Sequence, residues 1–211
     1  MKKRIAVLVS GGGTNLQALI DAQMRGELGG GEIAAVISSK AGAYALERAA
    51  KAGIPGYVLP RKEFDSNQAM TVALVEMLKD MSIDLVVLAG CMIIFTQELV
   101  DAYPNAIMNV HPALIPSFCG KGYYGLHVHE EALKYGVKLS GATVHFVSEE
   151  CDGGPIIAQK AVAIEENDTP ETLQKRIMEE AEWKLLPEAV SLFCQDRLSV
   201  EGRIVKIKEN I

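Results

Sequence analysis

Short apolar segments alternate with amphipathic segments over the first half of the chain. Five apolar segments predict buried strands, at residues 5–9, 33–37, 57–59, 85–88 and 106–110. The amphipathic segments between them predict helices, at residues 14–23, at residues 44–52, from about residue 66 onward, and at residues 96–102. Because these strands are apolar on both faces and alternate with helices, the pattern indicates a parallel sheet covered on both sides.

The pattern changes after Val110. Residues 143–147 and 156–163 predict two strands that are joined by a turn-rich segment at residues 152–155, as in a hairpin. Thr169 and Pro170 predict the start of a long helix, because threonine caps helices and proline suits the first helical position. Residues 198–207 predict a small terminal hairpin. We therefore expect a single α/β domain over residues 1–211, with a Rossmann-like, mostly parallel sheet, helices on both faces, a C-terminal hairpin and a long helix.

Composition narrows the class of protein. Hydrophobic residues make up 49% of the chain and charged residues 23%, which is typical of a globular domain. The formal net charge of −6 does not suit a non-specific nucleic-acid binder. No stretch approaches the length of a membrane span, and the four cysteines lie far apart. We expect a cytoplasmic protein with reduced thiols and with no nucleic-acid or membrane partner.

The segment from Ser10 to Asn15 contains three glycines and connects the first predicted strand to the first predicted helix. Glycines let the backbone approach a ligand closely, and free N–H groups at a helix start attract an anion. The segment is not a Walker loop and fits a dinucleotide fingerprint poorly, because Leu16 occupies the position of the third glycine. It predicts either a phosphate site or a tight turn without a ligand.

Asn109 and His111 are candidate catalytic residues at the end of the fifth predicted strand. Side chains alternate along a strand, so both project to the same side. An amide and an imidazole held there could polarise a carbonyl and protonate a leaving amine, or could satisfy loop backbone groups instead. Asp152 is an ordinary turn residue unless the hairpin places its carboxylate beside His111, where it would stabilise an imidazolium.

Three other histidines are weaker candidates. His127 and His129 form a pair that could suggest a metal site, but no nearby cysteine or carboxylate pattern supports one. We interpret them as surface or substrate-loop residues. His145 lies in a predicted strand and is interpreted as a satisfied core residue or as support for a site.

Five motifs together resemble one family over nearly the whole chain. They lie at residues 10–15 (SGGGTN), 89–92 (AGCM), 109–116 (NVHPALIP), 125–129 (GLHVH) and 152–155 (DGGP). The Asn-x-His-Pro motif and the downstream Asp-Gly-Gly-Pro resemble the 10-formyltetrahydrofolate-dependent formyltransferases. The glycine loop that ends in Thr-Asn is similar to the phosphoribosylglycinamide formyltransferase branch of that family, which acts in purine biosynthesis.

The resemblance implies transfer of a formyl group from 10-formyltetrahydrofolate, as co-substrate, to the amine of glycinamide ribonucleotide, with no metal. It implies that Asn109 and His111 contact the formyl oxygen, that His111 donates a proton, and that Asp152 raises the pKa of His111. It implies a nucleotide-binding half at about residues 1–103 and a catalytic and folate-binding half at about residues 104–211.

The resemblance also implies binding residues. The ribonucleotide site would consist of Gly13, Thr14, Asn15, Glu179 and Glu182. Glu182 best fits the acid that binds the ribose hydroxyls when counted back from Pro187, and Glu179, one turn earlier, flanks the same site. The folate site would consist of Asn67, Met92, Ile93, Ile94, Phe95, Asn109, Ser148, Glu149, Glu150, Cys151 and Asp152, held largely through backbone contacts.

Two positions depart from the family pattern. Ile93 and Asn67 stand where relatives have an arginine, so we expect no charged folate contact from these side chains. In addition, the segment at residues 117–125 is longer than the corresponding compact loop, and its glycines and Lys121 could shape either the phosphate side or the substrate side.

Rival functions remain. A methionyl-tRNA formyltransferase is expected to carry a further RNA-binding domain, and a formyltetrahydrofolate hydrolase an additional regulatory domain. A non-catalytic nucleotide-binding module would explain the glycine loop but would leave Asn109, His111 and Asp152 without a role. A formyl-transfer assay with and without glycinamide ribonucleotide separates these functions. The chain is expected to be a monomer or a homodimer.

Overall fold

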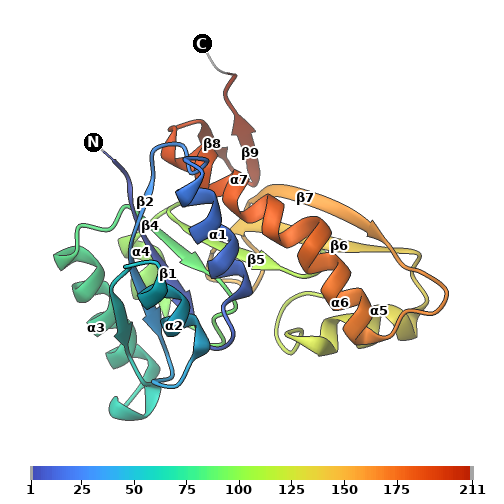
Figure 1. The fold of residues 1–211 in the computed structure, drawn as a ribbon, viewed down its shortest axis with the longest axis horizontal. Coiled ribbons are helices and arrows are strands. Elements are labelled where there is room, and N and C mark those ends of the chain that lie inside the picture. Colours follow the sequence, from blue (N-terminus) through green and yellow to red (C-terminus); the bar gives the residue numbers. More distant parts are fainter. Residues whose placement is uncertain (1, 210–211) are drawn as a thin grey trace.

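The computed structural model describes residues 2–209, and its strands form one sheet (Figure 1). Within these residues the sheet has nine strands in the order β3-β2-β1-β4-β5-β6-β7-β9-β8. The strands are β1 (Arg4–Val9), β2 (Glu32–Ser38), β3 (Gly56–Val58), β4 (Leu85–Leu88), β5 (Ile107–His111), β6 (Leu139–Phe146), β7 (Ile156–Ala163), β8 (Leu198–Glu201) and β9 (Ile204–Ile207).

The direction of the strands divides the sheet into two regions. Strands β1 to β5 pair in parallel, whereas β6 runs antiparallel to both β5 and β7. The terminal hairpin β8–β9 joins the sheet through a parallel pairing of β9 with β7. The predicted single α/β domain with a mostly parallel sheet is therefore confirmed, and the antiparallel region begins where the apolar pattern changes, after Val110.

Helices cover the two faces of the sheet. They are α1 (Thr14–Met24), α2 (Tyr44–Lys51), α3 (Asn67–Asp80), α4 (Gln97–Ala102), α5 (Leu126–Tyr135), α6 (Pro170–Ile177) and α7 (Trp183–Cys194). A short 3₁₀ turn spans Arg61–Glu63, and a π-helix, Met178–Glu182, connects α6 to α7. The predicted long helix after Thr169 is thus a continuous run of α6, the π-helix and α7.

Alternation of side chains along β1 separates two hydrophobic cores. Ile5 and Val7 face a core that includes residues of α1, α2, α6 and α7, whereas Ala6 and Leu8 face a core with residues of α3 and α4. All four side chains are almost completely buried. Burial of a leucine or isoleucine side chain contributes about 1.5–3 kcal/mol, so these two layers hold the sheet and its loops in place.

Local sequence explains where several elements begin and end. The side chain of Ser66 accepts a hydrogen bond from the N–H of Ala69 and caps α3. Thr169 and Thr172 form a capping box at the start of α6, with Pro170 at the first helical position. Both helix starts were predicted from the sequence, whereas the ten-residue helix α5 was not.

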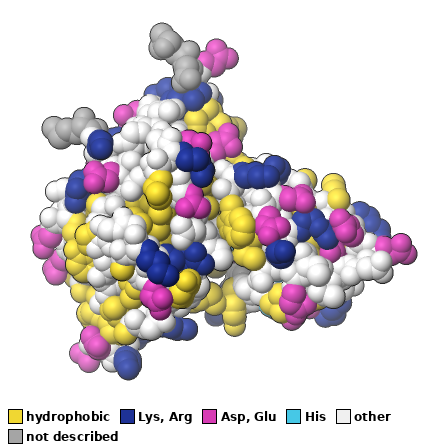
Figure 2. Space-filling view, viewed as in Figure 1, with side chains coloured by type: hydrophobic (Ala, Val, Ile, Leu, Met, Phe, Trp, Pro, Cys, Tyr) yellow, Lys and Arg dark blue, Asp and Glu magenta, His cyan; other side chains and the backbone are white. Residues whose placement is uncertain are grey.

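On the face shown in Figure 2, basic, acidic and hydrophobic side chains are interspersed. Neither sign of charge dominates this face, which is unlike the continuous basic stripe of a nucleic-acid binder. Within residues 2–209 no helix is long and apolar enough to cross a membrane.

Candidate active site

Strand β5 carries the first two candidate residues. Asn109 and His111 lie two positions apart on β5, and therefore on the same face of the sheet. The antiparallel neighbour β6 places His145 directly opposite Asn109. His111 and His145 are 4% and 1% exposed, so both imidazoles are shielded from bulk water.

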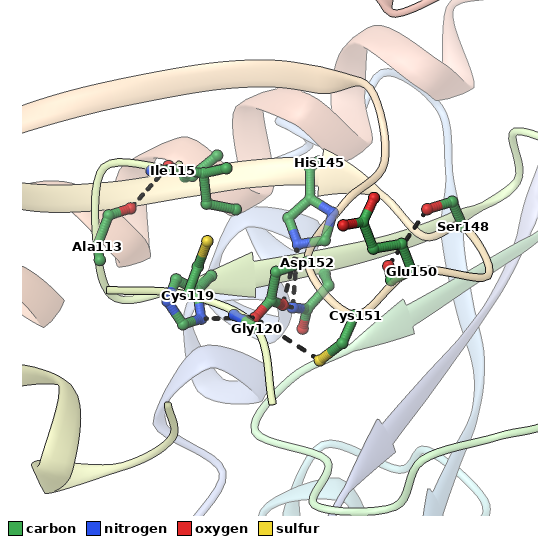
Figure 3. A network of polar contacts seen from close by, with 12 residues as sticks. Ala113, Ile115, Cys119, Gly120, His145, Ser148, Glu150, Cys151 and Asp152 are labelled. Carbon is green, nitrogen blue, oxygen red and sulfur yellow. Dashed lines mark hydrogen bonds and ion pairs between the residues drawn. The ribbon is translucent and has the colours of Figure 1, made fainter. Parts of the chain in front are cut away.

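Asp152 comes from the connection between β6 and β7, which folds back over this face. Its Oδ2 atom lies 3.6 Å from Nδ1 of His111, and its Oδ1 atom lies 3.5 Å from Nε2 of His145. The Asn109 amide donates to Oδ1 at 3.4 Å, and the N–H of Gly120 donates to Oδ2 at 2.9 Å. Figure 3 shows Asp152 between His145 and Gly120. The hairpin therefore brings Asp152 beside His111, which was the condition for treating it as more than a turn residue.

The surroundings keep Asp152 ionised. Burial by itself raises the pKa of this carboxyl, but the hydrogen bond with His145, the nearby charge of His111 and the Gly120 N–H together lower the pKa to about 2. The backbone of Asp152 has a φ of 54°, in the left-handed region that asparagine and aspartate tolerate better than other side chains. A fixed negative charge therefore lies against two imidazoles.

The net pKa of His111 is set by two opposing effects. Burial lowers the pKa, and Asp152 and the carbonyl of Phe118 raise it by less, so the net pKa lies below the ordinary value. Asp152 thus acts in the direction that the resemblance implies, whereas the depth of burial, which decides the net direction, is not visible in the sequence. Nε2 of His111 donates to the Phe118 carbonyl at 2.8 Å.

His145 orients Asn109. Nδ1 of His145 donates to the carbonyl oxygen of Phe146 at 2.8 Å, which fixes the orientation of the ring. Its Nε2 atom lies 3.2 Å from the Asn109 amide nitrogen and 3.5 Å from Oδ1 of Asp152. His145 therefore supports the site, in agreement with one of its two sequence interpretations.

The glycine loop lies at the start of α1. Gly13 has a φ of 72°, and a Cβ atom added there would lie 2.6 Å from Cβ of Ala45, so the position requires glycine. The Asn15 amide donates to Oε2 of Glu182 at 2.6 Å. Within residues 2–209, Oδ1 of Asn15 is buried without a hydrogen-bond partner.

The structure separates the two acids that were predicted for the ribose. Glu182 is 6% exposed, and its burial raises its pKa. Glu179 instead points outward, where its carboxylate lies 3.7 Å from Nζ of Lys175 on the helix surface. Both residues belong to the π-helix, but only Glu182 faces the glycine loop.

The residues predicted for the folate lie in three segments. Met92 and Ile94 are 55% and 67% exposed, whereas Ile93 and Phe95 line a small depression beside Leu74 of α3. The N–H of Met92 donates to Oγ of Ser10 at 2.9 Å, which ties this segment to the glycine loop. The second segment, Ser148, Glu149, Glu150 and Cys151, precedes Asp152 and is largely exposed.

The third segment is the start of α3, where Asn67 is the first helical residue. Its side chain accepts a hydrogen bond from Arg61, so the amide is already engaged within the protein. A contact of Asn67 with the folate stays a prediction.

The segment at residues 117–125 covers His111. Its Phe118 ring makes edge contacts with Tyr123 and Tyr135. Helix α5 follows, and it corrects one interpretation: His127 is exposed, but His129 is completely buried. Burial, with a smaller effect of His111, lowers the pKa of His129 to about 4. The sequence interpretation failed because the helix was not predicted and its buried face was therefore unknown.

Comparison with known proteins assigns the family. A family model described as formyl transferase matches residues 3–190. The chain belongs to the formyl transferase family. The family model covers both the glycine loop and the Asn109–Asp152 cluster, so the two candidate sites lie within the region that members share.

Individual relatives within the formyl transferase family are similar over most of the chain. The phosphoribosylglycinamide formyltransferase of Haemophilus influenzae is 41% identical over 202 residues, which are 96% of this chain and 92% of the relative. The trifunctional purine biosynthetic protein adenosine-3 of Bos taurus is 42% identical over 211 residues, and this chain spans 20% of its length.

Among solved structures, the glycinamide ribonucleotide transformylase 1 of Symbiobacterium toebii superimposes with a TM-score of 0.93 at 45% identity. The match covers 99% of this chain and 95% of that one. The formyl transferase fold of this chain is thus shared from end to end with that protein.

Sequence reasoning missed two backbone groups of this candidate site. The Gly120 N–H and the Phe118 carbonyl both contact the cluster, and both belong to the segment at residues 117–125. Backbone groups carry no residue-type signal, so the only sequence hint was the unusual length of the segment.

Proposed function

We propose that this chain transfers the formyl group of 10-formyltetrahydrofolate to the amine of N1-(5-phosphoribosyl)glycinamide, a step of de novo purine (IMP) biosynthesis. The names of its relatives support this reaction. The observation that carries the proposal is the contact of an ionised Asp152 with His111 and Asn109 at a buried site. This arrangement supplies a proton carrier and an amide donor, which are the groups that formyl transfer to an amine requires.

The ribonucleotide is assigned to the glycine loop. The N–H groups of Gly13, Thr14 and Asn15 hold its phosphate at the positive end of α1, and Glu182 accepts hydrogen bonds from the ribose hydroxyls. The unpartnered Oδ1 of Asn15 supports this assignment, because a buried acceptor costs free energy until a ligand donor satisfies it. The Asn15–Glu182 hydrogen bond joins the proposed nucleotide-binding half, at residues 1–103, to the catalytic half, at residues 104–211.

The folate is assigned to the segments at residues 92–95 and 148–152. Exposed Met92 and Ile94 offer apolar area to a flat ring, and backbone groups of both segments offer hydrogen bonds to its edge. Asn109 and Asp152 lie at the end of this surface where the proposal places the formyl group. Ile93 and Asn67 contribute no charge, so the acidic tail of the folate is held without them.

The proposed reaction proceeds by direct attack. The amine nitrogen forms a bond to the formyl carbon, and the carbonyl electron pair moves to the oxygen, which the Asn109 amide and His111 stabilise. The oxyanion then re-forms the carbonyl, and the bond between the formyl carbon and the folate nitrogen breaks. The attacking nitrogen loses a proton and the departing folate nitrogen gains one, so the total charge is conserved. His111 carries this proton, and Asp152 stabilises the imidazolium while the proton resides there. The route needs no metal and forms no covalent enzyme intermediate.

The contacts of His111 add a condition to this mechanism. Its two ring nitrogens face the Asp152 carboxylate and the Phe118 carbonyl, so neither nitrogen is directed to a substrate while both contacts persist. Donation to the folate nitrogen therefore requires the Phe118 carbonyl to be displaced. In this proposal the segment at residues 117–125 moves when the substrates bind, so that the Phe118 carbonyl no longer accepts a hydrogen bond from His111.

An assay of the purified protein with 10-formyltetrahydrofolate tests the proposal. We expect tetrahydrofolate formation that depends on glycinamide ribonucleotide, with no release of formate and no effect of a metal chelator. Formate release in the absence of the ribonucleotide would assign hydrolysis instead. Absence of both reactions, with folate binding intact, would assign a binding module.

A further inference from the structure

Helix α2 holds the glycine loop through two successive carbonyl groups. The N–H of Ala45 donates to the carbonyl oxygen of Gly11 at 3.1 Å, and Nε of Arg48 donates to the carbonyl oxygen of Gly12 at 2.8 Å. The fit is close, because a Cβ atom on Gly13 would lie 2.9 Å from Cα of Ala45. The loop is therefore positioned against α2 as well as by its own chain.

These two contacts determine where the loop directs its donors. In a planar trans peptide, the C=O of one residue and the N–H of the next point in opposite directions. With the Gly11 and Gly12 carbonyls held by α2, the N–H groups of Gly12 and Gly13 point away from α2. Within residues 2–209, neither of these N–H groups makes a hydrogen bond. Two adjacent free donors that point to the same side can together bind an anion.

Arg48 is itself held in place. Its Nη1 atom donates to Oε1 of Gln17 at 2.9 Å, and Gln17 in turn donates to Asp21 at 2.8 Å, so α1 fixes the guanidinium from the other side. The guanidinium also lies over the ring of Tyr44, 5.0 Å from its centroid. In Figure 1, α2 lies beside the start of α1, which is where this bridge forms.

We propose that Arg48 is a positioning residue of the phosphate site: it orients the Gly12–Gly13 peptide so that the loop N–H groups face the ribonucleotide phosphate. This inference rests on the proposed ribonucleotide function of the glycine loop. Arg48 acts through the Gly12 carbonyl and takes no part in formyl transfer. Its positive charge adds to the attraction of the anion, but the two-point contact with Gly12 and Gln17 sets the geometry.

Four variants separate orientation from charge. Arg48→Ala removes both, Arg48→Lys keeps the charge but not the planar two-point contact, and Gln17→Ala removes one anchor of the guanidinium and leaves its charge. Lys51→Ala is the matched control, because Lys51 is a cation on the same helix that lies 5.4 Å from the Tyr44 ring and makes no contact with the loop among the described residues.

Each variant is tested by binding of inorganic phosphate, followed through the amide resonances of Gly12 and Gly13, and by steady-state kinetics. We expect Arg48→Ala and Arg48→Lys to weaken phosphate binding and to raise the KM for the ribonucleotide by about 10-fold, the range of one charge-assisted hydrogen bond. In both Arg48 variants, kcat and the KM for the folate stay within about twofold of the wild-type values. Gln17→Ala weakens phosphate binding and raises the KM for the ribonucleotide by a smaller factor. Lys51→Ala resembles the wild type.

Three results would overturn the inference. Wild-type behaviour of Arg48→Lys would show that charge alone matters, and an equal effect of Lys51→Ala would show that any cation on α2 suffices. Equal increases in both KM values would indicate general loss of structure, which circular dichroism also detects. The phosphate titration needs no catalysis, so it remains interpretable even if the protein does not transfer formyl groups.

Discussion

The two candidate sites of this molecule are built in different ways. The glycine loop, at residues 10–15, is one continuous segment that offers mainly backbone donors at the end of a parallel strand. The cluster around Asp152 instead combines side chains of β5 and β6 with backbone groups of residues 118–120 in the antiparallel region. In our proposal the anion site is therefore local in sequence, whereas the proton-transfer site combines groups that are separated by tens of residues.

The largest effect is expected from a substitution that disrupts the cluster around Asp152. His111→Ala lowers the rate of formyl transfer by about 100-fold to 10,000-fold, because the proton carrier is lost. Binding of a non-reactive folate analogue changes by only a few fold, since the folate in our proposal is held by the segments at residues 92–95 and 148–152. Single-turnover kinetics and calorimetry on one preparation measure both quantities. His127→Ala, at an exposed histidine, is the control, and a wild-type rate for His111→Ala would leave His111 as a loop anchor only.

Removal of the charge beside His111 is expected to have the next largest effect. Asp152→Asn keeps the shape and tolerates the φ of 54°, but the neutral amide no longer stabilises an imidazolium, so turnover falls by about 100-fold. Asp196→Asn is a matched control, because Asp196 also has a φ of 54° but a side chain that is 77% exposed. Near-normal turnover of a folded Asp152→Asn protein would remove Asp152 from the mechanism.

The antiparallel region is also expected to be the more sensitive one to acid. The pKa of His129 is about 4 in the folded state and near 6.5 in the unfolded chain, so protonation below pH 6.5 favours the unfolded state. The contribution of the buried, neutral His129 to the unfolding free energy is therefore complete above pH 6.5 and is lost as the pH falls toward 4. The loss corresponds to roughly 3 kcal/mol of unfolding free energy. His111, whose pKa burial also lowers, acts in the same direction.

Urea unfolding between pH 7 and pH 4 tests this origin of the acid sensitivity. We expect His129→Leu to give a shallower decline of the unfolding free energy than the wild type, and the exposed-site variant His127→Leu to leave the decline unchanged. A parallel decline in all three proteins would place the acid-sensitive groups elsewhere.

The smallest expected effect concerns the glycine loop and compares two neighbouring glycines. Gly13→Ala lowers the unfolding free energy by about 1–3 kcal/mol, because its φ is 72° and the new Cβ would lie 2.6 Å from Ala45. Gly12→Ala has no heavy atom within 4 Å of the new Cβ and no positive φ, so its stability stays close to that of the wild type. Equal stability of the two variants, measured by urea unfolding, would show that the contact between the loop and α2 is not tight.

Much of the first site could be predicted from the sequence. A strand, three glycines and a helix start are contiguous, so local rules identify the turn and its free N–H groups. The start of α3 near Ser66 and the start of α6 at Thr169 were predicted from local signals as well. Local rules do not identify the partner of Asn15. The family resemblance favoured Glu182, with Glu179 one turn earlier, and in the structure Glu182 contacts Asn15 while Glu179 points outward.

The sequence by itself determined the alternation of strands and helices, the glycine loop, and the placement of Asn109 and His111 on one side of a strand. These features follow from side-chain periodicity and backbone freedom, which act over a few residues. Only the tertiary structure decided that Asp152 reaches His111, that His129 is buried, and that the pKa of His111 is lowered. The physical reason is that burial, and the distance between charged groups, depend on which remote segments pack together. A local sequence pattern does not encode that packing.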